Sequence, residues 1–305
     1  MPKGTISAEQ GSDNIALAVG AILVTVFALS LGDALIKQVS AGFVLWQIFV
    51  VRSLLAVPVL LLVILVFAKN ASLIPIQLGW TSVRSLMLVF MWIAYYVSLP
   101  HLQLSVAAAA YYTLPLFITL FSAVFVGERI SKLGWLAVVI GFLGVLLILR
   151  PKAEEFNAYA LLPLVSAMLY ALAMILTRTK CQTEHPLTLS LVLNIYFVLT
   201  GVIAAVMISV FVGPDRNGFL LAPWTPMEAE QWTAMCLLAA AILIGSIGAA
   251  IAYQKGPSSM VGTFDFAYVG FAVLWGLVFF AEVPDIVSMA GMLMIVAAGV
   301  LSVRQ

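Results

Sequence analysis

The sequence predicts an all-α integral membrane protein with ten transmembrane helices. Of its 305 residues, 64% are hydrophobic and 9% are charged, whereas a typical soluble domain is about half apolar and about a quarter charged. The mean hydropathy is +1.16. Apolar runs long enough to cross a bilayer core of roughly 30 Å recur along the whole chain.

The ten runs follow one another closely, and each ends at a short polar or Pro/Gly-containing stretch. The first run follows the polar segment 1–14 and has no small-residue cleavage site behind it, so we interpret it as a retained helix rather than a signal peptide. No run shows the alternating polarity of a membrane β-strand. The expected spans are 15–39, 43–68, 80–99, 103–126, 133–150, 158–178, 187–212, 231–254, 259–281 and 286–303.

The breaks between these spans justify the division in order. In the first half they read SAG at 40–42, KNASLIPIQLG at 69–79, PHL at 100–102 and GERISK at 127–132. After PKAEEFN at 151–157, the second half is divided at TKCQTEHP (179–186), at 213–230, at KGPS (255–258) and at EVPD (282–285). The longest of these, 213–230, is too short for a soluble domain. We therefore expect the protein to act within the bilayer.

Basic residues in the loops predict the orientation. With ten spans both termini lie on one side, and cytoplasmic loops of membrane proteins carry an excess of Lys and Arg. If the N-terminus is cytoplasmic, the inner loops hold Lys3, Lys69, Arg129, Lys132, Arg178, Lys180, Lys255 and Arg304, and the outer loops hold only Lys37, Arg150, Lys152 and Arg216. We expect a multi-pass protein of the cell inner (plasma) membrane with both termini in the cytoplasm.

The two halves of the chain resemble each other when the sequence is aligned with itself. A constant shift superimposes spans three to five on spans eight to ten without a gap. It brings Ser105 onto Ser259, Phe117 onto Phe271, Phe125 onto Phe279, Glu128 onto Glu282 and Arg150 onto Arg304. The chain is therefore expected to contain a cytoplasmic tail at 1–14 and two five-helix repeats at 15–150 and 158–304.

The loops indicate that the second repeat is inverted. Five spans per half is an odd number, so a tandem copy must insert upside down. GERISK at 127–132 would then lie inside, and its counterpart AEVPDI at 281–286 outside. The second copy keeps the Glu and lacks both basic residues, in agreement with the charge rule. Inverted repeats of this kind are typical of secondary transporters with a binding site near the midplane.

These segments resemble a known family. The pattern from Ser105 to Pro115, the apolar run into GlyGluArg at 127–129 and the Gly-spaced span GWLAVVIGFLGVLLILRP resemble the EamA domain of the drug/metabolite transporter superfamily. The second half is similar to a more diverged copy, which departs from the pattern after Glu282. Within the superfamily, the chain resembles bacterial YddG-type amino-acid exporters. The resemblance implies ten helices, a central cavity lined by helices one to four and six to nine, and export of small metabolites.

Charged residues within the spans are the strongest clue to a site, because each is costly in a bilayer and tends to face a cavity or a partner. Counting residues along the spans places Asp33 and Arg52 in the outer half, and Arg84 and Asp265 in the inner half. We therefore predict two ion pairs, Asp33 with Arg52 and Arg84 with Asp265, that act as gates or as handles for a zwitterion. In the simpler alternative, Arg84 extends to the interface and Asp33 pairs with Lys37. Asp265 could also bind a substrate ammonium group or carry a coupled proton.

Aromatic residues within the spans predict an amphipathic cavity wall. Tyr and Trp usually anchor at membrane interfaces, but here seven lie inside spans three, four, six and nine: Trp92, Tyr95, Tyr96, Tyr111, Tyr112, Tyr170 and Tyr268. We expect Tyr112, Tyr170 and Tyr268 to line the cavity, because the resemblance implies that their helices form it, with Tyr111, Tyr95 and Trp92 beside them. Ordinary helix packing is the alternative.

Other functional classes fit the sequence less well. No nucleotide-binding GxxxxGK[ST] motif, HExxH motif or GxSxG motif occurs. His101 and His185 fall in loops on opposite sides, so no shared metal site is expected, and no cofactor is implied. A net charge of +1 suggests no nucleic-acid partner. We predict a secondary transporter of small metabolites, most of all amino acids. Drug-like cations or other metabolites are the runner-up, and a membrane enzyme or scaffold is a distant alternative. The sequence leaves the oligomeric state open.

Overall fold

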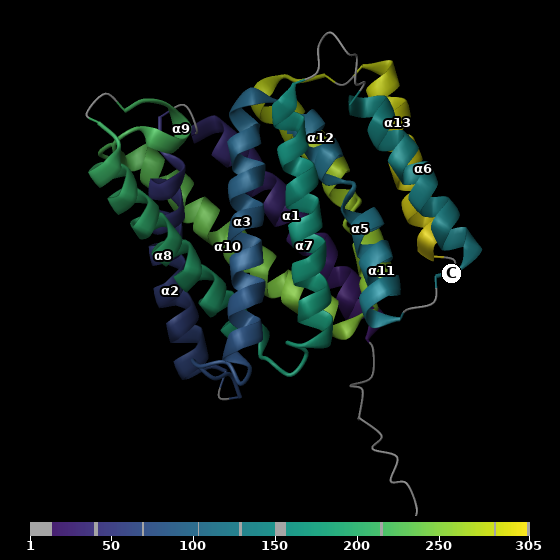
Figure 1. Cartoon of the computed structure of the whole chain (residues 1–305), viewed down its shortest axis with the longest axis horizontal. Helices are drawn as coiled ribbons and strands as arrows, with labels where there is room; N and C mark the ends of the chain where they lie inside the picture. The colour runs from purple at the N-terminus through teal and green to yellow at the C-terminus, as the bar shows by residue number, and fades with distance from the viewer. Residues whose placement is uncertain are drawn as a thin grey trace, which may run out of the picture.

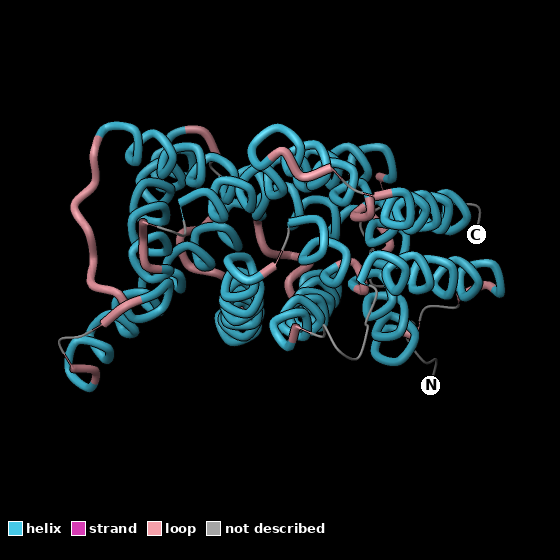
Figure 2. Tube along the Cα trace, turned by 90° about the horizontal axis from the view of Figure 1, so that it is seen from above, coloured by secondary structure: helices cyan, strands magenta, loops and turns pink. Residues whose placement is uncertain are grey.

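The computed structural model describes residues 14–39, 42–68, 70–102, 104–127, 130–149, 157–213, 216–283 and 285–303. All regular structure in these ranges is helical (Figure 2). Seven helical stretches of the described chain are long and apolar enough to cross a membrane, so this is a multi-pass membrane protein. The count of ten spans stays a prediction. The tail 1–13 and the basic and repeat landmarks Lys3, Lys69, Glu128, Arg129, Arg150, Lys152 and Arg304 lie outside the described residues.

The helices follow the predicted spans closely. In the first half the helices are α1 (Ile15–Val39), α2 (Leu45–Val66), α3 (Leu78–Ser98), α4 (Leu104–Tyr111), α5 (Leu114–Phe121) and α6 (Lys132–Leu149). In the second half they are α7 (Leu161–Thr179), α8 (Pro186–Phe211), α9 (Gly218–Leu221), α10 (Ala229–Lys255), α11 (Ser258–Phe264), α12 (Ala267–Phe280) and α13 (Ile286–Val303). Two predicted spans, 103–126 and 259–281, are each divided into two helices.

The helices pack mainly against partners from the other half of the chain (Figure 1). α1 packs against α10 and α12, α3 packs against α7, α2 packs against α8, and α6 packs against α13 at one edge of the molecule. If each helix in these pairs is replaced by its equivalent in the other half of the chain, the resulting pairs of helices are also in contact. For example, the contact of α1 with α12 has its counterpart in that of α7 with α5, and the contact of α4 with α12 in that of α11 with α5.

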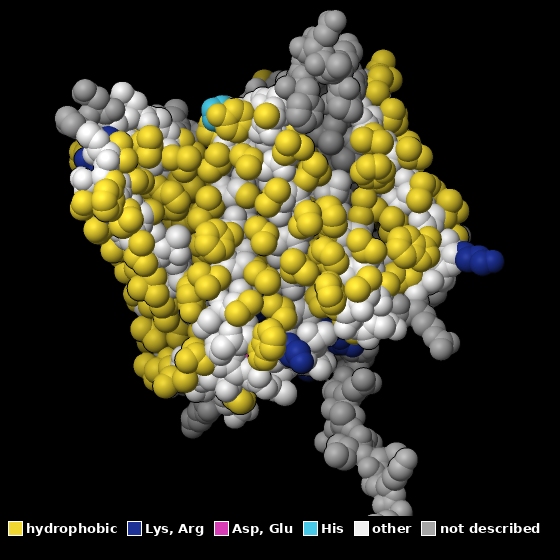
Figure 3. All heavy atoms as spheres, in the orientation of Figure 1, with side chains coloured by type: hydrophobic (Ala, Val, Ile, Leu, Met, Phe, Trp, Pro, Cys, Tyr) yellow, Lys and Arg dark blue, Asp and Glu magenta, His cyan; other side chains and the backbone are white. Residues whose placement is uncertain are grey.

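The outer surface is largely apolar. Hydrophobic side chains cover most of the face seen in Figure 3, and the Lys and Arg side chains visible there lie near its margins. Leu65, Val210 and Leu293 are each exposed over about two thirds or more of their surface, at 67%, 67% and 70%. Such a surface is unfavourable in water and favourable against lipid tails.

Small residues let α1 and α10 approach each other closely. A Cβ atom built on Gly248 would lie 2.2 Å from Thr25 Oγ1 and 3.2 Å from the carbonyl oxygen of Ala21. One turn earlier, a Cβ on Gly245 would lie 2.3 Å from Leu29 Cδ2. Glycine at both positions therefore allows the backbones to come together, as is common where membrane helices pack.

Side chains clamp loops to each other at both ends of the bundle. At one end, the buried Glu184 carboxylate accepts hydrogen bonds from the backbone N–H of Ile76 (3.1 Å) and of Gln77 (2.6 Å). At the other end, Gln47 Nε2 donates to the carbonyl of Thr225 (2.6 Å), and the Thr225 N–H donates to Gln47 Oε1 (3.0 Å). These clamps join the loops that precede α3 and α10 to the starts of α8 and α2.

An ion pair joins α1 to the segment that follows α12. Lys37 Nζ lies 2.6 Å from Glu282 Oε1, and both side chains are mostly buried, at 16% and 20% exposure. Lys37 also donates to the carbonyl of Leu102 (3.3 Å). Glu282 is the residue that the self-alignment pairs with Glu128, and through this ion pair it connects the second half of the chain to α1.

Charge reversal at this junction provides a test. We expect Lys37→Glu to lower the stability of the folded protein by about 1–2 kcal/mol, between the values typical of exposed and of buried pairs. The double variant Lys37→Glu with Glu282→Lys should recover part of the loss, because opposite charges again face each other. Thermal unfolding in detergent measures both effects. A double variant no more stable than the single one would contradict the assigned contact.

Candidate functional site

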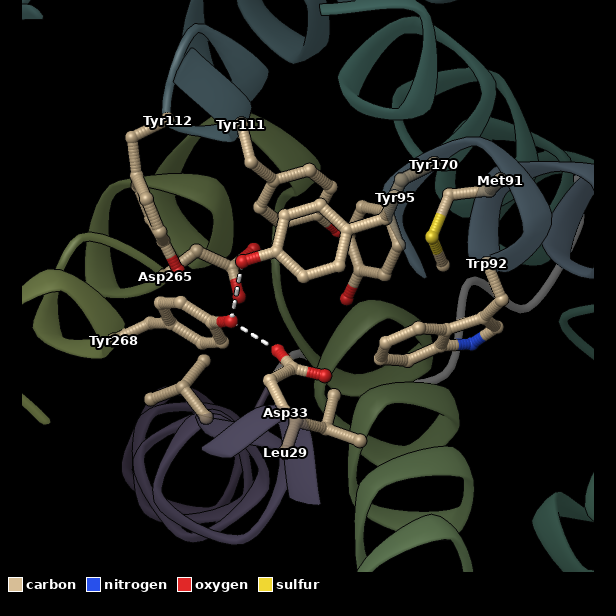
Figure 4. Close-up of a pocket in the computed structure, with 11 residues that line it drawn as sticks. Leu29, Asp33, Met91, Trp92, Tyr95, Tyr111, Tyr112, Tyr170, Asp265 and Tyr268 are labelled. Carbon is tan, nitrogen blue, oxygen red and sulfur yellow. Dashed lines mark hydrogen bonds between the residues drawn. The ribbon is translucent and has the colours of Figure 1, made fainter. Parts of the chain in front are cut away.

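A small chamber lies among α1, α3, α7 and α12 (Figure 4). It encloses about 20 Å³, which is room for about one water molecule. Its lining comes from α1, α3, α7, α12 and the two broken spans, and consists of Val26, Leu29, Asp33, Met91, Trp92, Tyr95, Tyr111, Tyr112, Tyr170, Asp265 and Tyr268.

Two interrupted helices deliver residues to this chamber. α4 ends at Tyr111 and α5 begins at Leu114, and α11 ends at Phe264 and α12 begins at Ala267. The alignment that superimposes Glu128 on Glu282 also superimposes Tyr111 on Asp265, so the two breaks occupy corresponding positions. Irregular backbone within a membrane is tolerated where it lines a cavity, and paired breaks of this kind mark binding sites in transporters.

Both carboxylates of the chamber are held by tyrosine hydroxyls. Asp265 is 2% exposed and accepts a hydrogen bond from Tyr253 Oη at 2.5 Å. Asp33 is 1% exposed and accepts from Tyr268 Oη, which also lies 3.0 Å from Tyr95 Oη. Asp33 Oδ1 has no hydrogen-bond partner among the described residues. Buried acids in this setting are costly, and they typically mark substrate or ion pathways.

Aromatic rings form the rest of the wall. The ring centroids of Tyr112 and Tyr268 lie 5.2 Å apart, as do those of Tyr95 and Tyr111. Tyr170 faces Tyr111 across 6.1 Å. These rings offer apolar faces for stacking and hydroxyls for hydrogen bonds, so the chamber can hold a ligand that is partly apolar and partly polar.

The two arginines lie outside this chamber. Arg84 lines an adjoining space of about 20 Å³ that shares Leu29, Met91, Trp92 and Tyr170 with the first. Arg52 lines neither space. Its Nη1 donates to Tyr96 Oη (3.2 Å), and its guanidinium carbon lies 4.4 Å from the ring centroid of Phe197. Cation–π contacts of this kind partly replace the hydration of the buried charge.

Comparison with known proteins relates this architecture to transporters. Residues 16–150 match the EamA-like transporter family. The chain is 28% identical to the pseudopaline exporter of Pseudomonas aeruginosa strain UCBPP-PA14, over 89% of this chain and 90% of that protein. Within residues 16–150, this chain is thus similar to EamA-like transporters.

Other relatives of this chain carry different names. It is 27% identical to a riboflavin transporter of Vibrio cholerae serotype O1 strain El Tor Inaba N16961, over 85% of this chain and 82% of that protein. It is 21% identical to an S-adenosylmethionine uptake transporter of Rickettsia bellii strain RML369-C, over 92% and 91%. A solved crystal structure has the same fold, with a TM-score of 0.68 and 18% identity over 94% of this chain and 95% of the other. These three relatives are all named as exporters or transporters of small molecules.

The observed contacts of the four charged residues differ from the predicted ion pairs. Neither pair is formed among the described residues: Asp33 and Arg52 instead both approach Tyr96, and Arg84 Nε donates to Thr177 Oγ1 (2.6 Å). The depth estimates also placed Asp33 and Asp265 in opposite halves, whereas both line one chamber. Counting residues along a span gives the depth of a side chain only where the helix is unbroken, and Asp265 lies at a break. The count also does not give the direction in which a side chain points around the helix axis.

Sequence reasoning missed two residues that hold the charged groups in place. Tyr253 donates to Asp265, and Thr177 accepts from Arg84. Tyr253 lies near the end of the predicted span 231–254, where a tyrosine is typical of an interfacial anchor. Thr177 occupies a corresponding place in 158–178. No signal in the sequence distinguishes these polar residues from ordinary helix-packing groups. In the part of the chain described, no cluster of His, Cys, Asp and Glu is arranged to hold a metal ion.

Proposed function

We propose that this transporter exports amino acids, including aromatic and apolar ones, by alternating access around the tyrosine-lined chamber. The observation that carries the proposal is the pairing of two buried carboxylates, Asp33 and Asp265, with a largely aromatic wall. A carboxylate can hold a substrate ammonium group, and Tyr112, Tyr170 and Tyr268 can pack against an apolar side chain while their hydroxyls satisfy polar atoms. Tyr111, Tyr95 and Trp92 complete the wall.

The proposed mechanism requires two inverted five-helix halves that rock about this chamber. The pairing of α1 with α10 and α12, mirrored by that of α7 with α3 and α5, supports such a repeat. So does the position of the two helix breaks. We propose ten spans, with the halves at 15–150 and 158–304 and both termini in the cytoplasm of a bacterial cell. The loop clamps at the two ends are the contacts that such a motion would break alternately.

The relatives support a metabolite as substrate and leave its identity open. Their names specify pseudopaline, riboflavin and S-adenosylmethionine, and they include both an exporter and an uptake transporter. Drug-like cations are the second candidate, because two acids line the chamber while both arginines lie outside it. An amino acid and a cation differ in the carboxylate group, so competition between matched compounds distinguishes the two candidates.

Uptake of a labelled panel into proteoliposomes tests the proposal. The panel contains aromatic and aliphatic amino acids, and protein-free liposomes serve as the control. We expect saturable, protein-dependent flux of several of them, inhibited by an excess of the unlabelled compound. The same assay with and without a proton gradient tests whether Asp265 also carries a proton: a flux independent of both pH and the gradient excludes that role. Folded protein with no flux above the control for any amino acid would refute the proposal in favour of cations or other metabolites.

A further inference from the structure

Arg84 is a buried cation with an unused donor. Its side chain is 1% exposed, and its Nε donates to Thr177 Oγ1 at 2.6 Å. Its Nη1 has no hydrogen-bond partner among the described residues. A guanidinium in the membrane interior is unfavourable unless an anion or hydrogen-bond acceptors compensate it. The single threonine contact leaves most of this demand unmet.

The titratable groups around Arg84 do not neutralise it. The Cys181 thiol and the Tyr170 phenol are the titratable groups that act on it. Burial raises the pKa of the Cys181 thiol, against smaller opposing effects of Thr81 and Arg84, so this thiol stays uncharged at physiological pH. The Glu184 carboxylate, which acts on Cys181, is engaged by the backbone N–H groups of Ile76 and Gln77.

The space that Arg84 lines adjoins the central chamber. Its lining includes Gly245, Ser246 and Ala249 of α10, whose side chains are small or absent. It shares Met91, Trp92 and Tyr170 with the chamber that contains the two carboxylates. The acids and the arginine therefore line neighbouring spaces that have one wall in common.

We propose that Arg84 binds the carboxylate of a zwitterionic substrate whose ammonium group lies in the chamber of Asp33 and Asp265. The proposal rests on the proposed transport of amino acids and assigns the two ends of the substrate to two subsites. Thr177 fixes one edge of the guanidinium, which leaves Nη1 to donate to an incoming oxygen. Charge-assisted bonds of this type are stronger than neutral ones. Trp92 and Met91 then lie against the apolar part of the substrate.

Matched ligands that differ only in the carboxylate test the assignment. The pairs are L-phenylalanine with phenethylamine and L-leucine with isopentylamine, measured by equilibrium binding to purified protein. We expect Arg84→Gln to weaken binding of the amino acids by about 10- to 100-fold, the effect of losing a hydrogen bond to a charged group. Binding of the amines should stay unchanged, and this also shows that the variant is folded. Arg84→Lys should be intermediate, because it keeps the charge and loses the planar fork.

The control is Arg216→Gln, which removes a positive charge outside both spaces and should leave both ligand classes unaffected. Equal weakening of amino acids and amines by Arg84→Gln, or no weakening of either, overturns the subsite. Flux of amino acids through the wild-type protein distinguishes failure of the Arg84 subsite from failure of the proposed amino-acid transport. If flux is present and Arg84→Gln does not discriminate, only the subsite is wrong. If no amino acid is bound or transported, the proposed function and the subsite both fail.

Discussion

Replacing Asp265 with asparagine is expected to lower amino-acid transport by about tenfold or more. The substitution removes the negative charge but keeps an oxygen that can accept the hydrogen bond from Tyr253, so the local structure should persist. The loss of a charge-assisted contact to an ammonium group corresponds to about 1.5–3 kcal/mol. The initial rate of labelled amino-acid uptake into proteoliposomes measures the effect.

The control for this variant is Glu230→Gln, which neutralises an exposed acid in the first turn of α10. Its transport rate should match that of the wild type. A second variant, Tyr253→Phe, removes the donor and keeps the carboxylate, and we expect it to be less harmful than Asp265→Asn. Transport by Asp265→Asn at the wild-type rate would show that this carboxylate does not take part in binding or coupling.

Replacing Gly248 with valine is expected to prevent stable assembly of the bundle. The new side chain would meet Thr25 Oγ1 and the backbone carbonyl of Ala21, and a backbone atom cannot move aside as a flexible side chain can. Overpacking in a core typically costs about 1–3 kcal/mol, occasionally more, and here it would separate α1 from α10. We expect a large loss of monodisperse protein after detergent extraction and a lower midpoint of thermal unfolding.

Gly20 offers a matched control on α1, the helix that packs against Gly248 of α10. It lies on the exposed face of α1, and a Cβ atom there has no neighbour within 4 Å. Gly20→Val should therefore leave yield and thermal stability near those of the wild type, although both substitutions add the same side chain to a helix. If the two variants behave alike, the effect reflects helix propensity rather than the contact between α1 and α10.

The helical segments could be predicted from the sequence because the bilayer imposes a simple requirement on them. A span must be apolar over its length and must satisfy its own backbone, so its ends are visible as polar breaks. The predicted 133–150 and 286–303 agree with Lys132–Leu149 and Ile286–Val303 within one residue. The apolar run 259–281, in contrast, gave no sign of the break at Asp265, because the surrounding helices rather than local residues stabilise it.

The chamber lining could be predicted only in part. Seven residues expected to line a cavity do line it, because aromatic and acidic side chains in the middle of a span are rarely placed there without a partner or a cavity: Trp92, Tyr95, Tyr111, Tyr112, Tyr170, Asp265 and Tyr268. Their participation in binding stays a prediction. The partners of Asp33, Arg52 and Arg84 could not be predicted, because pairing depends on the rotation of each helix about its axis, and one sequence without homologues contains no record of it.

The small volume of the central chamber has a consequence for measured affinity. A chamber of about 20 Å³ is smaller than an amino acid, so the proposed transport requires a wider conformation of the chamber. The observed dissociation constant is then the intrinsic one divided by the fraction of molecules in the wide form. A substitution that raises this fraction about tenfold would improve observed affinity about tenfold without touching the substrate. Conformational equilibrium would then set apparent substrate preference alongside chamber chemistry.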